Sequence, residues 1–430
     1  MELAGKKALL ICVETGKGFP CSDSLQELED LCRTLEINVY DKLIQKRDRP
    51  DPVFFVGSGK LQRIAEAVKN GEVNLIIVDD ELTPVQHRNL EEHLKCLVMD
   101  RTQIILEIFA NHATTAEGKL QVELARLAYE LPRLRGKGLF LSNPGGGVGT
   151  RGPGEKILEL DKRKIKDRIS HLRRELKKLT LNRANIRKAR LESGYPIISI
   201  VGYTNAGKST LLSRLAREES ILVSSKLFST LNPATRRVKM PGGRIFLFSD
   251  TVGFIRKLPH TLIEAFRSTL EEVLFADLLV VLVDASDPFY NDKLKATFGV
   301  LEEIRASEKP KMVVFNKIDE VPFERLEMLK LEHPSGHFIS AKTGQGIPEF
   351  LETVEKFVLS NEPCIVVNVD VTMVHELEKL REFITVTPIV ESFENSEKLR
   401  FKICGPESVL KKMKKYFEGG HEDNGTKGLD

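Results

Sequence analysis

One octapeptide, GYTNAGKS at Gly202–Ser209, constrains the fold of this chain more than any other feature. It fits the pattern GxxxxGK[ST], it directly follows the apolar run Ile197–Val201, and it precedes a helical stretch that begins near Lys208. A glycine-rich turn between a buried strand and a helix N-terminus presents backbone N–H groups that bind anions. The motif therefore predicts a doubly wound α/β domain with a phosphate-binding loop.

Each residue of this loop has an expected role. Lys208 should reach the β- and γ-phosphates of a nucleotide, and the Ser209 hydroxyl should ligate Mg²⁺. The other predicted contacts come from Gly202, Tyr203, Thr204, Asn205, Ala206, Gly207 and Thr210. A purely structural glycine turn is the alternative, and the flanking strand and helix make it the weaker interpretation.

A second segment, Asp250–Gly253, follows the apolar run Ile245–Phe248. We expect Asp250 to hold Mg²⁺ through water and the N–H of Gly253 to meet the γ-phosphate. The intervening residues of this segment are Thr251 and Val252. Such a segment completes a phosphate site but does not choose between ATP and GTP.

The choice of base is predicted from a third segment, which follows the strand-like run Met312–Phe315 and consists of Asn316, Lys317, Ile318 and Asp319. A carboxylate at Asp319 can accept hydrogen bonds from N1–H and the 2-amino group of guanine, whereas adenine offers neither donor there. Asn316 should support the loop and the base, and the Lys317 stem can cover the ring. These residues favour guanine.

A fourth segment, after the strand-like His337–Ile339, consists of Ser340, Ala341 and Lys342 and can offer backbone N–H groups to guanine O6. Any one of the four segments could arise by chance, but four in this order indicate a site for Mg²⁺ with GTP or GDP. We therefore expect a GTP hydrolase.

Between the first two segments, Leu227–Arg236 should contain a switch threonine that binds Mg²⁺ and senses the γ-phosphate. Thr230 is our choice and Thr235 the alternative. The nucleotide contacts expected here are Phe228, Ser229, Thr230, Leu231 and Asn232. The residues expected to carry catalysis are Lys208, Thr230, Asp250 and Gly253.

Phe254 follows Gly253, at the position where Ras-like GTPases have a glutamine that orients water. A phenyl ring cannot polarise water. We therefore expect slow turnover by the protein alone, at or below ~10⁻⁴ s⁻¹, and strong stimulation by a partner.

The length of 430 residues exceeds what one hydrophobic core can organise, so several domains are expected. Residues 1–110 alternate short apolar runs, among them Ala8–Val13, Val53–Val56, Leu75–Val78 and Cys96–Met99, with amphipathic stretches, which predicts a small α/β domain. Within it, Val56–Lys60 resembles a phosphate loop but lacks the first glycine and the final hydroxyl residue. We do not expect it to bind nucleotide.

Residues 111–195 contain two leucine-rich seams that predict an antiparallel helical hairpin, with Leu120–Leu134 facing Leu158–Ile186. Their connection, Gly136–Gly154, is too rich in glycine and proline for a helix or strand, and we interpret it as a probe ordered by a partner rather than a spacer. Lys156–Arg190 carries 14 Lys or Arg against four Asp or Glu. Such clustering favours structured RNA over a merely solvated face.

Residues 196–360 make up the predicted nucleotide-binding domain. After them, residues 361–418 read as a small α+β domain of strand, helix, two strands and helix, with one strand at Ile389–Phe393. The tail, 419–430, is polar and expected to be disordered.

Six scattered cysteines without CxxC pairs predict buried free thiols, and neither a disulfide framework nor a zinc site. The apolar run at the start is too short for a signal peptide, and no stretch approaches a membrane span. We expect a cytoplasmic monomer without a DNA partner that is not an integral membrane protein; peripheral association with a membrane is left open.

Taken together, these residues resemble the HflX GTPases of the Obg-like group over nearly the whole chain. The likeness includes Asp100–Thr102, Glu117–Leu124, Gly149–Glu155, the Gly202 loop and Asp250–Ile255. The hydrophobic residue at position 254 belongs to that family's pattern, and Asn232 departs from its usual Asp. The resemblance implies a GTPase that binds the large ribosomal subunit (50S) and its rRNA and dissociates stalled or idle ribosomes, with the hairpin loop entering the peptidyl-transferase region.

Two other functions are considered beside this one. Related GTPases serve ribosome assembly or RNA modification, which stimulation by precursor particles would support. A non-catalytic, nucleotide-gated scaffold is suggested by Phe254, and undetectable phosphate release would support it.

Overall fold

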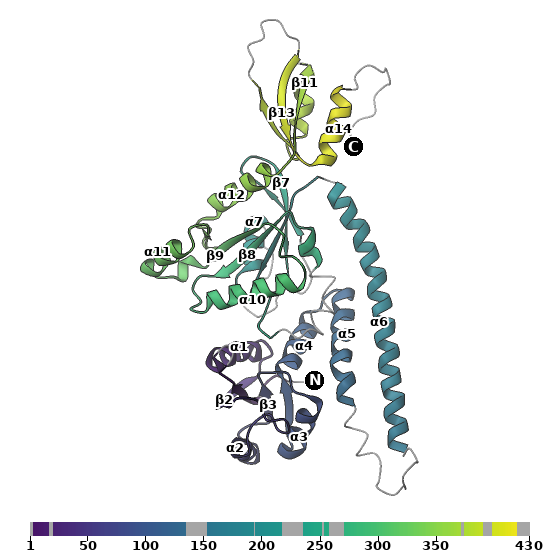
Figure 1. Ribbon diagram of the computed structural model, residues 1–430, viewed down its shortest axis with the longest axis vertical. Coiled ribbons are helices and arrows are strands. Elements are labelled where there is room, and N and C mark those ends of the chain that lie inside the picture. Colours follow the sequence, from purple (N-terminus) through teal and green to yellow (C-terminus); the bar gives the residue numbers. More distant parts are fainter. Residues whose placement is uncertain are drawn as a thin grey trace. The chain divides into compact units, whose positions relative to one another are not determined.

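The computed structural model describes residues 3–16, 20–134, 153–192, 194–216, 235–251, 253–257, 271–370, 374–389 and 398–418 (Figure 1). By their contacts the residues fall into two compact units. The first comprises Met1–Thr180, Ser224–Asn232 and Ile255–Thr269, and the second comprises Leu181–Val223, Pro233–Phe254 and Leu270–Asp430. Each unit is described by itself.

The first unit begins with a four-stranded parallel sheet in the order β2-β1-β3-β4. Its strands are β1 (Lys7–Glu14), β2 (Asn38–Lys46), β3 (Leu75–Val78) and β4 (Leu97–Asp100). The helices that alternate with them are α1 (Cys21–Thr34), α2 (Ser58–Lys69), α3 (Pro84–Leu94) and α4 (Arg101–His112). Strands buried on both faces read as continuous apolar runs, which explains why β1 and β3 could be predicted. The predicted α/β class is confirmed here.

The strand predicted at Val53–Val56 is wrong. This stretch is a turn closed by the paired backbone groups of Asp51 and Phe55, and Phe55 has a positive φ of 66°. The strand that the prediction missed is β2, an edge strand in which most side chains are exposed or half-buried. An edge strand needs few apolar residues, so its sequence lacks an apolar run.

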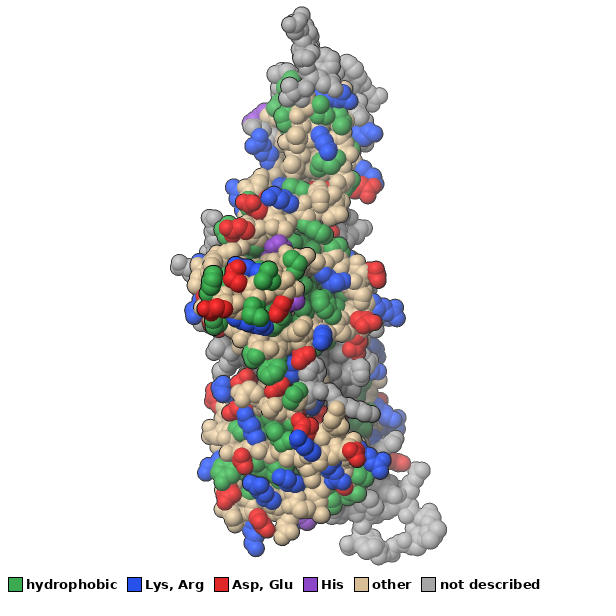
Figure 2. All heavy atoms as spheres, turned by 60° about the vertical axis from the view of Figure 1, so that its left-hand side comes forward, with side chains coloured by type: hydrophobic (Ala, Val, Ile, Leu, Met, Phe, Trp, Pro, Cys, Tyr) green, Lys and Arg blue, Asp and Glu red, His purple; other side chains and the backbone are tan. Residues whose placement is uncertain are grey.

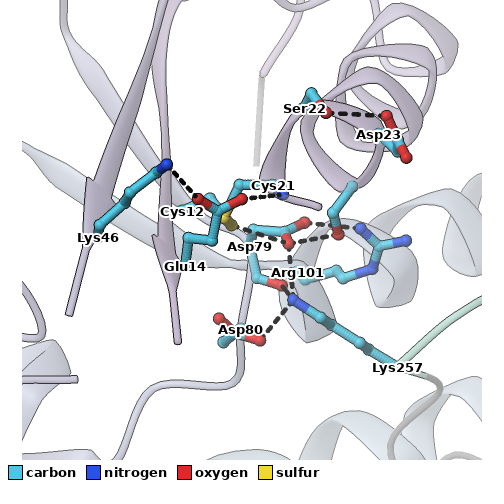
Figure 3. The surroundings of a disulfide bond; sticks show 11 residues. Cys12, Glu14, Cys21, Ser22, Asp23, Lys46, Asp79, Asp80, Arg101 and Lys257 are labelled. Atoms are coloured by element: carbon cyan, nitrogen blue, oxygen red, sulfur yellow. Dashed lines mark hydrogen bonds and ion pairs between the residues drawn. A yellow bond between two sulfur atoms is a disulfide. The ribbon is translucent and has the colours of Figure 1, made fainter. Parts of the chain in front are cut away.

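Two carboxylates lie at the carboxyl ends of β3 and β4. Asp79 is fully buried and accepts hydrogen bonds from Ser24 at 2.6 Å, from Arg101 at 2.7 Å and from Lys257 at 2.7 Å. Lys257 also contacts Asp80 at 2.6 Å (Figure 3). A buried charge requires such partners, because water cannot solvate it.

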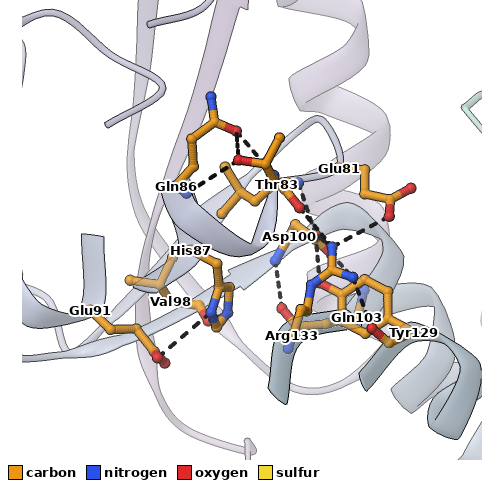
Figure 4. Close-up of polar contacts among 11 residues, drawn as sticks. Glu81, Thr83, Gln86, His87, Glu91, Val98, Asp100, Gln103, Tyr129 and Arg133 are labelled. Atoms are coloured by element: carbon orange, nitrogen blue, oxygen red, sulfur yellow. Dashed lines mark hydrogen bonds and ion pairs between the residues drawn. The ribbon is translucent and has the colours of Figure 1, made fainter. Parts of the chain in front are cut away.

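The second carboxylate, Asp100, joins this sheet to the next helix, α5 (Ala116–Arg133). It begins α4 through a capping box with Gln103 and accepts the hydroxyl of Tyr129 at 2.6 Å (Figure 4). Burial raises the pKa of Asp100, and these hydrogen bonds oppose the rise. Arg133 stacks on the Tyr129 ring at 3.4 Å and donates to Leu82 O at 2.6 Å.

The predicted helical hairpin is confirmed by α5 and the long helix α6 (Pro153–Glu192), whose seams pack together. The residues at this contact are Leu120, Leu124, Leu127, Leu131, Ile165, Ile169, Leu172 and Leu176. The loop predicted to extend to Gly154 ends sooner, because α6 begins at Pro153, where the fixed φ of proline suits a first helical turn. Residues 136–152 of that loop lie outside the described residues.

The second unit contains a six-stranded sheet in the order β10-β9-β8-β5-β7-β6, parallel except for β6. Its strands are β5 (Ile197–Gly202), β6 (Thr235–Lys239), β7 (Ile245–Asp250), β8 (Leu278–Asp284), β9 (Lys311–Asn316) and β10 (His337–Phe338). The helices described with it are α7 (Lys208–Ala216), α10 (Tyr290–Glu303), α11 (Phe323–Glu332) and α12 (Ile347–Ser360). Two 3₁₀ helices, η2 (Glu271–Phe275) and η3 (Ile318–Glu320), also occur. The predicted doubly wound layout is confirmed.

A three-stranded antiparallel sheet in the order β11-β13-β12 follows. Its elements are β11 (Cys364–Asp370), α13 (Val374–Lys379), β12 (Thr385–Pro388), β13 (Lys398–Cys404) and α14 (Glu407–Glu418). The predicted order of elements is correct, but the second strand occupies Thr385–Pro388 rather than starting at Ile389. Its β-branched residues were a signal that the prediction overlooked.

The prediction that the cysteines are free thiols is wrong for four of the six. Cys12 is bonded to Cys21, and Cys364 to Cys404. Of the remaining two, Cys32 is a buried free thiol and Cys96 is partly buried. Both bonded pairs form through tertiary contacts, which sequence spacing alone does not reveal.

Helix α11 exposes most of its apolar side chains. It buries Leu329, whereas Phe323, Met328 and Leu331 are exposed at 73%, 53% and 83% (Figure 2). On the face drawn in Figure 2, hydrophobic side chains lie among acidic and basic ones. In the part of the chain that the structure describes, no helix has the length and apolar character needed to cross a membrane.

Candidate nucleotide site

The candidate site lies where the central strands of the six-stranded sheet end. Strand β5 pairs with both β7 and β8, and β8 pairs with β9, so the four carboxyl ends lie next to one another. In such sheets ligands bind beyond the carboxyl ends of the strands. The loop 203–207 follows β5, and α7 begins at Lys208.

Two glycines of the loop have no room for a side chain. Gly202 has φ of +151°, and a Cβ there would lie 2.3 Å from Leu282 O. Gly207 has φ of +92°, and a Cβ there would lie 2.3 Å from Asn316 Nδ2. The close approaches are to Leu282 of β8 and Asn316 of β9, and both glycines have a positive φ, so a side chain at either position would clash and strain the backbone.

Lys208 is almost fully buried, with 7% of its surface exposed, and its Nζ donates to Tyr203 O at 2.7 Å. Burial lowers the pKa of Lys208 to about 8, and the nearby Asp250 carboxylate opposes the change. The side chain is thus held against the backbone of the loop.

The Ser209 hydroxyl donates to Asp250 Oδ2 at 2.7 Å, and Asp250 is 1% exposed at the end of β7. A hydroxyl and a carboxylate side by side are hard oxygen donors of the type that Mg²⁺ prefers. The Thr251 hydroxyl is not directed to Asp250 or Ser209; it donates to Ile200 O at 2.8 Å. That contact ties the end of β7 to β5.

Gly253 and Phe254 lie directly against the phosphate loop. A Cβ at Gly253 would lie 3.0 Å from Lys208 Nζ and 2.9 Å from Thr204 Cγ2. The Phe254 backbone accepts from Thr204 N at 2.8 Å and donates to Gly202 O at 3.1 Å, while its ring is 1% exposed. Phe254 therefore joins two of the segments predicted to bind nucleotide and offers no polar side chain.

Asn316 connects the phosphate loop to the segments predicted to bind the base. Its Nδ2 donates to Ala206 O at 2.8 Å, and its Oδ1 accepts from Ala341 N at 2.9 Å. The side chain is 2% exposed. A single amide with both ends satisfied fixes three loops in one arrangement.

The residues expected around the base are arranged as follows. Lys317 has a positive φ of 65°, and its Nζ lies 2.6 Å from Asp284 Oδ2. Asp319 lies in η3 with 17% of its side chain exposed, and Lys342 Nζ is 4.0 Å from its Oδ2. Ser340 is buried and accepts from Thr343 N at 3.0 Å. The loops that carry these residues meet through Asn316.

Six of the predicted residues lie outside the described residues: Phe228, Ser229, Thr230, Leu231, Asn232 and Val252. The alternative switch residue, Thr235, is the first residue of β6 and pairs with Ser249. The exposed loop residue Asn205 has a positive φ of 62°, and Thr210 is half-buried in the first turn of α7.

Two contacts near the site were missed by the sequence reasoning. Asp284 holds Lys317, and it could have been found because it ends a buried parallel strand beside β9. Lys293 lies 5.1 Å above the Tyr203 ring and is itself bound by Asp287. No spacing rule connects α10 to the phosphate loop, so this second contact required the fold.

Family models match three consecutive parts of the chain. Residues 22–110 match the N-terminal region of GTP-binding GTPases, residues 112–190 match the middle region, and residues 197–317 match a model described as 50S ribosome-binding GTPase. A solved structure of a GTP-binding protein from Sulfolobus solfataricus with GDP is 26% identical, covers 82% of this chain and 98% of that chain, and has a TM-score of 0.42.

Curated relatives carry one common description, GTPase HflX. The chain is 46% identical over 83% of its length to the protein of Lacrimispora saccharolytica, covering 84% of that protein. It is 42% identical over 89% to that of Caldanaerobacter subterraneus, covering 86% of it, and 41% over 82% to that of Escherichia coli, covering 82% of it. The chain therefore belongs to the HflX family of GTPases.

Proposed function

We propose that this GTP hydrolase binds Mg²⁺-GTP at the carboxyl edge of the six-stranded sheet, with the base on the Asp319 side and the phosphates over α7. The observation that carries the assignment is the Asn316 side chain, which bonds both the phosphate loop and the Ala341 loop. A nucleotide spanning the two loops would thus meet a preformed site. We assign this activity to a GTPase (G) domain of residues 196–360. In chain order, we propose an N-terminal domain (1–110), the helical hairpin (111–195), the G domain and a C-terminal domain (361–418).

The donor set fits Mg²⁺. Ser209 Oγ and Asp250 Oδ2 are adjacent hard donors, and phosphate oxygens and water would complete the shell. Ser209 and the switch threonine, for which we propose Thr230, would be direct ligands, and Asp250 would act through water. When bound, the metal neutralises charge on the β- and γ-phosphates. Among the described residues, no group of three or more His, Cys, Asp or Glu is placed to hold a metal ion.

Hydrolysis transfers the γ-phosphoryl group to water, breaking its bond to the β–γ bridging oxygen and releasing GDP and phosphate. Lys208 would stabilise charge on the β- and γ-oxygens, and the Gly253 N–H would bind the γ-phosphate. Position 254 cannot orient the attacking water, because its ring is buried and its backbone is committed to the loop. We therefore propose slow turnover until a partner orders the site.

We propose that this partner is the large ribosomal subunit and that the chain uses GTP to bind it and to dissociate stalled or idle ribosomes in the cytoplasm. Support comes from the 50S ribosome-binding GTPase model and from α6. The face of α6 away from α5 exposes basic side chains, among them Arg163, Lys164, Lys166, Arg173, Arg174, Lys177 and Lys178. Cations spread over one side of a long helix suit the phosphates of folded RNA.

Charge reversal on α6 tests the partner. In a Lys177→Glu/Lys178→Glu variant, we expect at least about tenfold weaker co-sedimentation with purified 50S subunits in a GTP analogue, and a matching loss of 50S-stimulated GTP hydrolysis, because repulsion replaces phosphate contacts. Turnover without ribosomes should not change.

The control for this test is Lys295→Glu/Lys356→Glu, which reverses two exposed charges on α10 and α12. Equal loss in both variants, or no loss in either, would contradict a specific role of α6. Stimulation by precursor particles but not by mature subunits would instead support a role in ribosome assembly.

The pKa of Lys208 predicts a pH dependence of GTP affinity. The pKa of Lys208 is about 8 without ligand, and nucleotide phosphates should raise it. Above pH 8 the free lysine is largely deprotonated, so it must take up a proton when nucleotide binds. We expect nearly constant affinity below pH 7.5 and a roughly eightfold loss between pH 7.5 and 9, with proton uptake visible by calorimetry in buffers of different ionisation enthalpy.

Lys208→Arg is the matched control, since guanidinium stays charged over this range and any remaining slope reports ionisation of the nucleotide. A wild-type affinity that is flat to pH 9, with no proton uptake, would refute the role of a buried, partly deprotonated lysine.

A further inference from the structure

The inference concerns the two cysteines at the base of the C-terminal sheet. Cys364 is the first residue of β11 and Cys404 is the last residue of β13. They are direct partners in the antiparallel register, with Cα atoms 4.1 Å apart, and their sulfurs are bonded. Directly opposed residues of an antiparallel pair bring their Cβ atoms close together, as a disulfide requires.

The two disulfides of the chain differ in access to solvent. Cys364 is exposed and Cys404 is half-buried. Cys12 in β1 and Cys21 at the start of α1 are each only 2% exposed. Because exchange requires a small thiolate to reach a sulfur atom, exposed disulfides are the labile ones. The two pairs should therefore respond differently to the same reagent.

The Cys364–Cys404 bond encloses nearly the whole sheet. The sequence separation is 40 residues, and the enclosed segment holds β11, α13, β12 and β13. The core here is small: its buried members are Val367, Val369, Leu377, Ile384, Phe401, Ile403, Leu410 and Met413. Domains with small cores gain much of their stability from disulfide cross-links, because a cross-link reduces the conformational entropy of the unfolded segment.

We propose that Cys364 and Cys404 form a reversible thiol–disulfide exchange site for low-molecular-weight disulfides and thiols, and that its oxidation stabilises the C-terminal sheet. One cysteine thiolate attacks a small disulfide and displaces one small thiolate, leaving a mixed disulfide. The second cysteine thiolate attacks the mixed disulfide and displaces the other. Two protein thiols and one small disulfide thus give one protein disulfide and two small thiols.

The bond lies beside the connection from α12 to β11. Two residues before Cys364, the Glu362 carboxylate binds both terminal nitrogens of Arg244, which is 2% exposed just before β7. Next to Cys404, Gly405 N donates to Pro363 O at 3.2 Å. Oxidation therefore ties together the points where the chain enters and leaves the sheet.

The test uses the full-length protein in mixtures of reduced and oxidised glutathione. Peptide mapping after alkylation reports each cysteine, and amide hydrogen exchange reports the sheet. We expect the Cys364–Cys404 bond to form and break reversibly, faster than Cys12–Cys21, and oxidation to slow amide exchange in β11 and β13 at least tenfold. Cys404→Ser should abolish that redox response, and Cys96→Ser, at a free partly buried thiol, should keep it.

The proposal is overturned if the bond does not form at any glutathione ratio, if excess reduced glutathione leaves it intact, or if it forms without slowing exchange in the sheet. The comparison of oxidised with reduced wild type does not depend on a variant, so a folding defect in Cys404→Ser would not obscure the result. Neither nucleotide nor ribosomes are needed, which keeps this test separate from that of the proposed function.

Discussion

A Gly207→Ala variant should lose affinity for GTP and GDP by on the order of a hundredfold or more. The added Cβ would lie 2.3 Å from Asn316 Nδ2, in a backbone conformation of positive φ that costs alanine roughly 1–2 kcal/mol. Displacing Asn316 would break its bonds to Ala206 O and Ala341 N, and each lost buried bond costs about 1–3 kcal/mol. Together these costs correspond to at least the stated loss.

The measurement is equilibrium binding of a fluorescent GDP analogue, with circular dichroism to follow folding. Gly299→Ala is the matched control, because Gly299 lies in α10 with open space around its Cα, where alanine favours the helix. Near-wild-type affinity of Gly207→Ala would show that Asn316 can move without consequence. It would contradict the preformed link between the loops.

The central strands and the phosphate loop could be predicted because their signals are local. A strand buried on both faces is a continuous apolar run, and the Gly202–Ser209 pattern predicts both a phosphate loop and the start of the following helix. The edge strands β2, β6 and β12 were harder, since one open side allows polar residues. The strand proposed at Val53–Val56 failed for a different reason: an apolar run of four residues fits a turn that buries Phe55 and Val56 as well as it fits a strand.

The contacts that join distant loops could not be predicted. Asn316 was expected to support its own loop, but the bonds to Ala206 and Ala341 require three strand ends to be neighbours. The two disulfides depend on tertiary contacts in the same way. Phe254 was expected only to be unable to polarise water. The structure adds that its backbone joins the phosphate loop to the segment that follows β7. The choice of Thr230 over Thr235 stays a prediction.

Asp319→Asn should change which base the protein prefers. The carboxylate would accept two hydrogen bonds from guanine, and bonds to a charged group contribute about 1.5–3 kcal/mol each, so GTP affinity should fall by about a hundredfold or more. Xanthine carries a carbonyl in place of the 2-amino group. An asparagine amide can donate to that carbonyl and accept from N1–H, so xanthosine triphosphate should gain affinity.

Asp292→Asn is the matched control, because it removes a partly exposed carboxylate from α10. Its preference for GTP should equal that of the wild type, since surface charges on that helix do not contact the base in the proposed pose.

Calorimetric titration of wild type and Asp319→Asn with GTP, ATP and xanthosine triphosphate is the most direct test of guanine recognition. The account predicts that the wild type binds GTP far more tightly than the other two, and that the variant prefers xanthosine triphosphate. A wild type that binds ATP as tightly as GTP, or a variant whose order of affinities is unchanged, would contradict it.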